Sequence, residues 1–596
     1  MSQYRRSHTC GELRSSEQKQ KVTLCGWVHK RRDHGNLIFI DLRDRYGITQ
    51  LVIDPERSPG AHAAAGKLRM EWVIAVTGRV SLRKEGMQNA QMATGDIEID
   101  VEEFTILSEA NTPPIAVADD GTQTHEETRL RFRYLDMRRG EIGENLEKRH
   151  LAMLATRNFL DQKGFFEITT PILGRSTPEG ARDYLVPSRL FPGNFFALPQ
   201  SPQIFKQLLM IGGMDRYFQI APCFRDEDLR ADRQPEFHQI DLEMSFVTPA
   251  DIQQMTEEML AAIFEKVMGQ EIPHPFKRMT HLEAMERYGS DRPDLRYGME
   301  LIRLDDIAEK CNFTIFKEGI ASGNIVKALC VKGGASLSRK EVEKLGSFVA
   351  PFGLKGLAWM KHSEGSLTGG IAKFFSTEEL AAFEKRMHAE SGDLLLFACA
   401  AENVVNQSLD HLRRHLAKER NLIDNEKLEF VWVTDFPLFS WDEDENRIVA
   451  EHHPFTSPHP DDTSLLDSDP LKVRSLAYDV VLNGYELGGG SQRIHDAKLQ
   501  KKLFSLLKLS PEEIEEKFGF FVESLSYGTP PHAGIALGLD RLTMILCGTD
   551  NIRDVIAFPK TLKALDIMMQ SPAPVRSEQW RDLHLNELEP KEIPYV

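Results

Sequence analysis

Apolar and polar residues alternate in short runs near the start of the chain, a pattern typical of half-buried β-strands. The runs lie at 22–28, 37–42, 48–53, 72–78 and 97–101, with a helical interruption at 61–70. Five short strands and one helix predict a small barrel of the OB type, which often binds nucleic acids. A proline-containing connector at 111–123 then ends this unit.

Further along, the apolar spacing becomes helical, and Gly164 ends the first helix before a strand predicted at 165–169. Later strands and an amphipathic helix predict a larger α+β unit, at 217–221, 237–246, 252–267, 430–434 and 477–482. Residues 290–420 interrupt this unit with their own alternation of helices and strands, which predicts an inserted α/β domain.

Composition narrows the class of protein. The 596 residues are 41% hydrophobic and 27% charged, which suits about three or four globular domains. No apolar stretch approaches the ~20 residues that span a bilayer, and the polar N-terminus lacks a signal-peptide core. A cytoplasmic protein that does not enter membranes is therefore expected. Seven scattered cysteines without a CxxC pair predict neither disulfides nor a zinc site.

The net charge of −17 argues against a generic nucleic-acid binder, which usually carries a basic surface. This argument is weakened by two local clusters of basic residues, at 30–32 and 129–139. Either cluster could contact nucleic acid or form a solvated charged face, and the sequence alone weighs these equally.

Two segments carry residues suited to nucleotides. Residues 224–243 fit two antiparallel strands joined by a charged loop, with Arg225 on one strand and Phe237 on the other. An arginine can grip phosphate oxygens bidentately, and a ring can stack on a base. Residues 534–541 combine glycines with Arg541, without a P-loop or a Rossmann fingerprint. The alternative for residues 224–243 is a salt-bridged hairpin.

Two further segments contain charged residues that could contact a substrate. Asp479 and Glu486 are oxygen ligands of the kind that hold Mg²⁺ on nucleotide phosphates, although two surface acids are an alternative. Residues 200–206 predict a loop entering a helix, with Gln203 and Lys206 on one face. That lysine could neutralise a substrate carboxylate or simply be solvated.

Taken in this order, the segments resemble the three motifs of class II aminoacyl-tRNA synthetases. The helix and strand ending at Pro171 resemble motif 1, residues 224–243 motif 2, and residues 534–541 motif 3. The N-terminal barrel is similar to that of the Asp, Asn and Lys subgroup, and the insertion and the tail at 571–575 to bacterial-type aspartyl enzymes. The resemblance covers essentially the whole chain.

The resemblance implies a multidomain α+β protein with a catalytic domain built on an antiparallel sheet with flanking helices. Its implied parts are an OB-fold anticodon-binding domain at 1–108, a hinge at 109–140, catalytic segments at 141–289 and 421–560, the inserted domain at 290–420 and a C-terminal extension at 561–596.

The resemblance also implies a two-step reaction in which L-aspartate and ATP form aspartyl-adenylate, and the aspartyl group then passes to tRNA. The implied catalytic residues are Arg225, Glu227 and Arg541. The implied ATP-binding residues are Arg225, Asp226, Glu227, Gln234, Phe237, Glu486, Gly538, Leu539, Asp540 and Arg541, with Mg²⁺ on Asp479 and Glu486. Motif 1 implies a homodimer.

For the amino acid, Lys206 and Arg493 supply positive charge that suits an aspartate side chain and disfavours neutral asparagine or cationic lysine. The implied aspartate-binding residues are Glu179, Ser201, Gln203, Lys206, Arg225, Asp241, His452 and Arg493.

In the barrel, Arg32, Phe39 and Gln50 match residues that contact the anticodon. His34 and Gly86 match residues of relaxed enzymes, which charge both tRNA-Asp and tRNA-Asn. A non-discriminating enzyme is therefore expected, and a strictly tRNA-Asp-specific enzyme is the alternative.

More distant alternatives are an asparaginyl- or lysyl-tRNA synthetase, an asparagine synthetase and a non-catalytic tRNA-binding paralogue. The paired cations and the insertion disfavour the first, and the barrel disfavours the second. A paralogue would be expected to have lost Arg225, Arg541 or Glu486, and all three are present.

Overall fold

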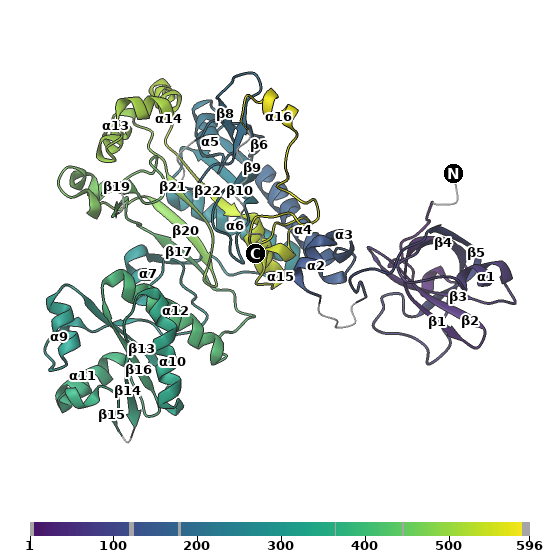
Figure 1. The fold of residues 1–596 in the computed structure, drawn as a ribbon, viewed down its shortest axis with the longest axis horizontal. Coiled ribbons are helices and arrows are strands. Elements are labelled where there is room, and N and C mark those ends of the chain that lie inside the picture. The colour runs from purple at the N-terminus through teal and green to yellow at the C-terminus, as the bar shows by residue number, and fades with distance from the viewer. Residues whose placement is uncertain (1–4, 119–123, 177–179, 364, 444–445, 587–596) are drawn as a thin grey trace. The chain divides into compact units, whose positions relative to one another are not determined.

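The computed structural model describes residues 5–118, 124–176, 180–363, 365–443 and 446–586 (Figure 1). The chain forms two compact units. The first comprises residues 1–149, 229–234 and 547–575, and the second comprises 150–228, 235–546 and 576–596. Across the described ranges, no helix is both long and apolar enough to cross a membrane. None of the seven cysteines, which all belong to the described ranges, forms a disulfide.

The first unit contains the predicted barrel, closed in the order β1-β2-β3-β5-β4. Its elements are β1 (Lys21–His34), β2 (Leu37–Asp44), β3 (Gly47–Ile53), α1 (Pro59–Ala65), β4 (Val73–Leu82) and β5 (Ile97–Ser108). The helix predicted at 61–70 is wrong at both ends. It begins after Ser58 and ends at Gly66, because the chain then forms tight turns up to Glu71, whose φ is +65°.

Four of the five arginines of the 129–139 cluster pair with acids of the same unit, and the fifth, Arg131, is exposed. They lie on α2 (Glu126–Arg131), α3 (Arg133–Asp136) and the turn before α4 (Gly140–Gln162). Arg129 and Arg133 lie 3.0 and 2.6 Å from the buried carboxylate of Asp136, and Arg138 lies 3.0 Å from Glu71. These ion pairs explain the cluster better than either alternative left open by the sequence.

The second unit is built on an eight-stranded sheet, ordered β11-β17-β20-β21-β22-β10-β9-β6. Its strands are β6 (Phe166–Glu167), β9 (Arg216–Phe224), β10 (Glu236–Ser245), β11 (Lys277–Thr280), β17 (Phe430–Thr434), β20 (Ala477–Leu482), β21 (Tyr485–Gln492) and β22 (His532–Gly538). All neighbours are antiparallel except β11 with β17 and β6 with β9. The antiparallel catalytic sheet predicted from the resemblance is thus confirmed.

Helices of this unit contribute to the core on the sheet. Apolar side chains of α4, α6 (Pro249–Met268) and α15 (Leu539–Cys547) join those of the central strands in one cluster. The strand predicted at 165–169 is shorter than expected and spans only Phe166–Glu167, although the Ile168 amide still donates to the Phe218 carbonyl at 3.1 Å. Other elements are α5 (Gln203–Ile211), α7 (His281–Tyr288), α13 (Ala497–Leu506), α14 (Pro511–Ser524), α16 (Ser577–Asp582), β7 (Leu185–Pro187), β8 (Phe195–Ala197), β18 (Phe439–Asp442) and β19 (Arg447–Ala450).

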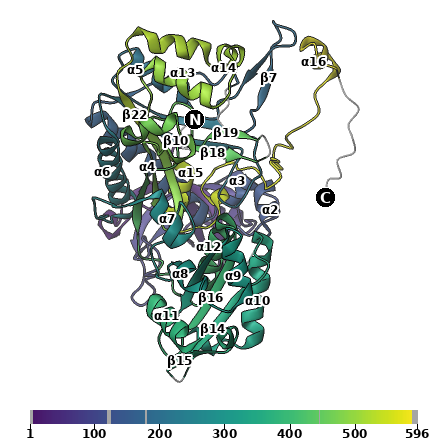
Figure 2. The same ribbon diagram turned by 90° about the vertical axis from the view of Figure 1, so that its left-hand side faces the viewer.

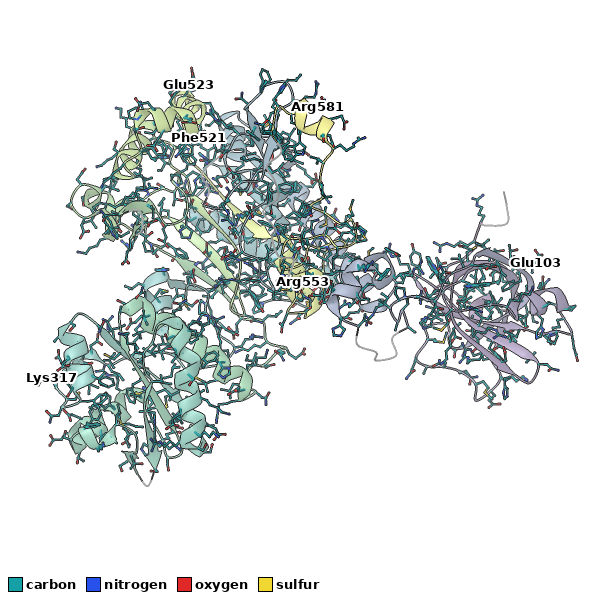
Figure 3. All side chains as sticks on the ribbon, in the orientation of Figure 1. Glu103, Lys317, Phe521, Glu523, Arg553 and Arg581 are labelled. Carbon is teal, nitrogen blue, oxygen red and sulfur yellow. The ribbon has the colours of Figure 1, made fainter. Side chains whose placement is uncertain are left out.

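The inserted domain has a sheet of its own, ordered β12-β13-β16-β14-β15, with helices packed on it (Figure 2). Its strands are β12 (Ile302–Arg303), β13 (Ile325–Val331), β14 (Ala358–Ser363), β15 (Ser366–Thr368) and β16 (Leu394–Ala400). Its helices are α8 (Asp305–Ala308), α9 (Thr314–Ala321), α10 (Arg339–Val349), α11 (Thr377–Met387) and α12 (Glu402–Glu419). Separate apolar clusters contain the alternate residues of its buried strands, so the insertion has its own core. Figure 3 shows Lys317 of α9 at the edge of this domain.

Candidate active site

The candidate site lies on the central strands of the large sheet. Alternation along β10 places Phe237, Asp241 and Glu243 on one face, because successive side chains of a strand point to opposite faces. Register then brings β10 next to the glycine-rich strands, with Asp241 opposite Ala536 and Glu243 opposite Gly534. Strand β22 pairs in turn with β21, and β21 with β20.

Four charged side chains form a buried cluster on this face. The Lys206 ammonium lies 2.8 Å from Asp241 Oδ1 and 3.4 Å from Glu243 Oε2. Arg493 donates from Nε and Nη2 to the two oxygens of Glu243 at 2.9 and 3.2 Å. The exposed fraction of each residue is between 0 and 4%. Two cations and two carboxylates balance in charge, which is the condition for tolerating such groups in the interior.

Glu243 was not among the residues predicted to bind aspartate, yet it contacts both cations. Its place depends on Gly534, where a Cβ atom would lie 1.9 Å from Glu243 Oε2. The sequence signal is the two-residue spacing of Asp241 and Glu243, which places both acids on one face of a strand. Only the register with β22 shows that the facing position is a glycine that leaves room for the carboxylate.

The electrostatics of the cluster differ between its two acids. Burial raises the pKa of Asp241, despite the nearby Lys206. Burial also acts to raise the pKa of Glu243, but the charges of Arg493 and Lys206 outweigh it and lower that pKa. His453 lies in the same surroundings, where desolvation and the two cations lower its pKa to about 3. Its imidazole is therefore neutral near pH 7.

Other predicted aspartate-binding residues come from the loop and helix that carry Lys206. The Gln203 amide donates to Ser201 Oγ at 3.3 Å. Gln203 begins α5 one turn before Lys206, and Ser201 lies in the loop before the helix. The side-chain nitrogen of Gln203 is buried and finds no hydrogen-bond partner among the described residues. A substrate group with an acceptor oxygen could satisfy this donor.

The predicted nucleotide-binding residues gather at one end of β10 and β22. The Arg225 guanidinium lies over the Phe237 ring, 5.2 Å from its centroid. Asp540 accepts a hydrogen bond of 2.6 Å from the His238 amide, which fixes the start of α15 beside Phe237. Gly538 ends β22, and Arg541 of α15 donates to the Glu486 carbonyl. The Leu539 side chain is buried in the core, so this residue offers a ligand only its backbone.

Asp479 and Glu486 stand on the two arms of the β20–β21 hairpin. Glu486 pairs with Val481, two residues from Asp479 on the same strand. Burial and the Glu486 charge raise the pKa of Asp479 to about 6, although His452 opposes them. His452 Nε2 lies 4.0 Å from Asp479 Oδ2, and this carboxylate raises the pKa of His452 against the effect of desolvation. The two acids are thus close enough to repel each other.

This donor set fits a divalent cation held together with phosphates. Mg²⁺ prefers oxygen ligands and commonly takes one or two carboxylates in addition to substrate phosphates. No group of three or more His, Cys, Asp or Glu residues in the described part of the chain could hold a metal ion by itself. Phosphate oxygens would complete the coordination at Asp479 and Glu486.

Four of the residues predicted to bind aspartate or ATP remain to be placed. Glu179 lies outside the described residues. Asp226 contacts Arg182 through an exposed ion pair of 3.7 Å, and Glu227 follows it in a half-buried position of the same loop. Gln234 belongs to the first compact unit, where its side chain exchanges hydrogen bonds with the Lys560 backbone at 3.0 and 2.7 Å.

The three predicted anticodon residues share one side of the barrel. Arg32 of β1 stands opposite Phe39 of β2, and Gln50 of β3 stands opposite Asp41. Arg32 donates to Asp41 at 2.7 Å and to Gln50 at 3.3 Å. Gln50 in turn donates to Glu98 at 2.9 Å, so a polar network surrounds the half-buried Phe39 ring. A partly accessible aromatic ring among polar groups is suited to an unstacked base.

His34 and Gly86 lie on two exposed loops of the barrel. His34 ends β1 beside the tight turn at Gly35 and Asn36, which both have positive φ. Gly86 lies between β4 and β5 with φ +80°, a conformation that favours glycine, and open space surrounds it. These two loops flank the β2–β3 face on which OB folds bind oligonucleotides.

A family comparison agrees with this geometry. The model described as "tRNA synthetases class II (D, K and N)" matches residues 125–562, and an OB-fold nucleic acid binding domain model matches residues 22–107. The chain belongs to the class II tRNA synthetases of the D, K and N group. The buried cluster, the Arg225–Phe237 pair and the hairpin that carries Asp479 and Glu486 all lie within the residues that the synthetase model matches.

Full-length relatives and solved structures of the same family resemble the chain. The aspartate–tRNA(Asp/Asn) ligase of Protochlamydia amoebophila is 59% identical over 585 residues, covering 98% of each chain. The ligase of the same name from Chlamydia caviae is 54% identical over 580 residues, covering 97% of this chain and 99% of that protein.

Among solved structures, the asparaginyl-tRNA synthetase of Pyrococcus horikoshii with asparaginyl-adenylate has a TM-score of 0.59 at 19% identity, covering 93% and 98% of the two chains. An aspartyl-tRNA synthetase of Entamoeba histolytica has a TM-score of 0.56 at 20% identity, covering 92% and 90%. These likenesses show the fold.

Proposed function

We propose that this protein is an aspartate–tRNA ligase that charges both tRNA-Asp and tRNA-Asn. The observation that carries the amino-acid specificity is the buried cluster of Lys206, Arg493, Asp241 and Glu243. The near-full-length relatives with the Asp/Asn name support the dual tRNA specificity.

In the first step, an aspartate carboxylate oxygen attacks the α-phosphorus of ATP. The bond from that phosphorus to the bridging oxygen breaks, and pyrophosphate leaves. Arg225 is suited to hold the α-phosphate and the attacking carboxylate, while Phe237 stacks on adenine and Glu227 lies beside the nucleotide. Arg541 is suited to the γ-phosphate of a bent ATP. Such chemistry depends on positioning and charge neutralisation.

In the second step, a terminal ribose hydroxyl of tRNA attacks the aspartyl carbonyl carbon. AMP leaves, the hydroxyl proton is released, and an ester joins the amino acid to the tRNA.

Mg²⁺ bound by Asp479, Glu486 and the phosphates would neutralise charge on ATP in the first step. Gly538, the Leu539 backbone and Asp540 shape the nucleotide end of the site, to which we also assign Asp226 and Gln234.

Selection of aspartate follows from charge. The side-chain carboxylate of the substrate would face Lys206 and Arg493, which Asp241 and Glu243 already hold in place. The neutral amide of asparagine would form weaker hydrogen bonds with these cations than a carboxylate does, and lysine would add a third cation, so both are disfavoured. Ser201, Gln203 and His452 line the same side, and we assign Glu179 to the substrate amine.

We further propose a homodimer that works in the cytoplasm, where translation consumes its product. The large sheet ends at β6, where an edge strand with exposed apolar residues offers a surface for a second copy. The exposed side chains there are Leu154, Phe166, Ile172 and Leu173.

The decisive experiment compares aspartate charging of purified tRNA-Asp and tRNA-Asn transcripts, with ATP–pyrophosphate exchange measured alongside. Comparable charging of both tRNAs is expected. Charging of tRNA-Asp alone would keep the enzyme and remove the dual specificity. Absence of aspartate-dependent exchange would contradict the ligase and favour a non-catalytic tRNA-binding protein.

Replacing His34 by leucine is expected to lower charging of tRNA-Asn relative to tRNA-Asp by about tenfold, which corresponds to about 1.4 kcal/mol. The imidazole at the hairpin end can exchange hydrogen bonds with more than one base, and leucine cannot. The ratio of kcat/KM for the two tRNAs measures this effect. The rate of pyrophosphate exchange should stay unchanged, and an unchanged ratio would contradict a role for His34.

A further inference from the structure

A buried arginine joins the inserted domain to the segment that connects it to the large sheet. Arg413 of α12 is fully buried, and its Nη2 donates to the backbone carbonyls of Asp294, Tyr297 and Gly298 at 2.7, 3.1 and 3.2 Å. Its Nε donates to the Met299 carbonyl at 3.1 Å. One side chain of the insertion thus fixes the path of residues 294–299.

Aromatic and charged groups strengthen the same joint. The Arg413 guanidinium lies 4.2 Å from the centroid of the Tyr297 ring and 5.0 Å from that of Tyr288, within the range of cation–π attraction. Lys327 of β13 donates to the Met285 and Glu286 carbonyls at 3.2 and 3.1 Å, near the end of α7. Two buried cations thus hold the insertion in place, Arg413 against residues 294–299 and Lys327 against the end of α7.

The fixed segment touches the turn of the β20–β21 hairpin. That turn consists of Asn483 and Gly484, both with positive φ, between the paired residues Leu482 and Tyr485. A Cβ atom at Gly484 would lie 3.1 Å from the Cβ of Asp294, tighter than ordinary van der Waals contact. Asp294 itself is fixed, because Arg296 donates to both of its carboxylate oxygens at 2.7 to 3.3 Å.

The hairpin that contacts this segment carries Asp479 and Glu486. They lie five residues before and two residues after Gly484, the point of contact with Asp294. We infer that Arg413 is a positioning residue for the Mg²⁺·ATP site, acting through Asp294 and the turn at Gly484. This inference rests on the proposed function of the hairpin. The insertion would then serve the first step of the reaction by fixing the end of the hairpin from outside the sheet.

The requirement for arginine follows from the acceptors. The acceptors at this joint are four backbone carbonyls and the Tyr297 hydroxyl, which together match the forked donors of a guanidinium. Lysine offers one ammonium and cannot reach them all. Arg413→Lys is therefore expected to keep the charge and loosen the segment beneath the turn.

The test measures ATP and aspartate separately. For Arg413→Lys we expect the KM for ATP in pyrophosphate exchange to rise about tenfold, because small displacements of positioned groups have large effects. The KM for aspartate should stay within about twofold, because Lys206 lies on α5 and Arg493 follows the end of β21 that is far from the turn at Gly484. The rise in Tm that Mg²⁺ with the non-hydrolysable analogue AMPPCP produces in wild type should shrink, and the rise produced by aspartate should not.

Two further variants keep the test decisive. Gly484→Ala perturbs the same contact from the hairpin and should reproduce the ATP-specific effect, even where Arg413→Lys fails to fold. Arg414→Lys is the matched control, since Arg414 is the next residue on α12 and pairs with Asp410 at 2.5 Å on a partly exposed face. This control should behave as wild type.

Three outcomes would overturn the inference: unchanged ATP constants in Arg413→Lys and Gly484→Ala, an equal loss of ATP and aspartate affinity, or the same effect in Arg414→Lys. A wild-type protein without aspartate-dependent exchange would refute the proposed function instead. The stabilisation by Mg²⁺ and AMPPCP needs no turnover, so it would still decide the role of Arg413.

Discussion

Replacing Lys206 by methionine is expected to abolish measurable aspartate activation and to lower the free energy of unfolding by about 3–5 kcal/mol. Lys206 is 1% exposed and lies beside two fully buried carboxylates. Methionine fills a similar volume without charge, so Asp241 and Glu243 would share Arg493 as their remaining cation in the cluster. An uncompensated negative charge in the interior destabilises the fold and repels the carboxylate of the substrate.

Aspartate-dependent pyrophosphate exchange and equilibrium unfolding in urea measure the two effects. Lys277→Met is the matched control, because Lys277 also pairs with a carboxylate, Glu429 at 2.6 Å, but its side chain is 65% exposed. Exposed ion pairs contribute about 0–1 kcal/mol, so this variant should change little. A Lys206→Met protein with the stability and aspartate KM of the control would refute the importance of the buried cluster.

Local patterns in the sequence predicted most of the architecture. The strands of the barrel and β10 follow from alternation, and α6 follows from helical spacing. The errors lie at the ends of elements, which local periodicity does not define. The strand predicted at 165–169 spans only Phe166–Glu167, and the helix predicted at 61–70 ends at Gly66.

In the candidate site, too, the sequence predicts some contacts, and others become evident only in the folded chain. Lys206 and Asp241 were expected to meet, and they lie 2.8 Å apart. The role of Glu243 is not evident from its spacing to Asp241 alone, because the room for its carboxylate depends on the facing residue, Gly534. The sequence does not indicate that Arg413 is buried, because a basic residue on an amphipathic helix normally reaches solvent. Both depend on tertiary contacts.

Replacing Arg225 by alanine is expected to lower the rate of aspartate-dependent exchange by about 10²–10³-fold, the usual effect of removing one preorganised donor from a site of developing charge. Arg225 stands on the strand end beside Phe237, with its guanidinium 5.2 Å from the ring centroid. An arginine stacked in this way is held ready to receive phosphate, while the ring offers a face for the base. Arg225→Lys keeps the charge but loses the bidentate geometry, so we expect an intermediate rate.

The stability of the Arg225→Ala protein should remain near that of wild type, because Arg225 is only half-buried. This separates the effect from that of Lys206→Met, in which activity and stability fall together. Arg339→Ala removes an 82% exposed arginine that pairs with Glu343 on the inserted domain and serves as the control. If Arg225→Ala retained exchange at the level of this control, motif 2 would not bind the reacting phosphate, and the assignment of Phe237 to adenine would lose its main structural support.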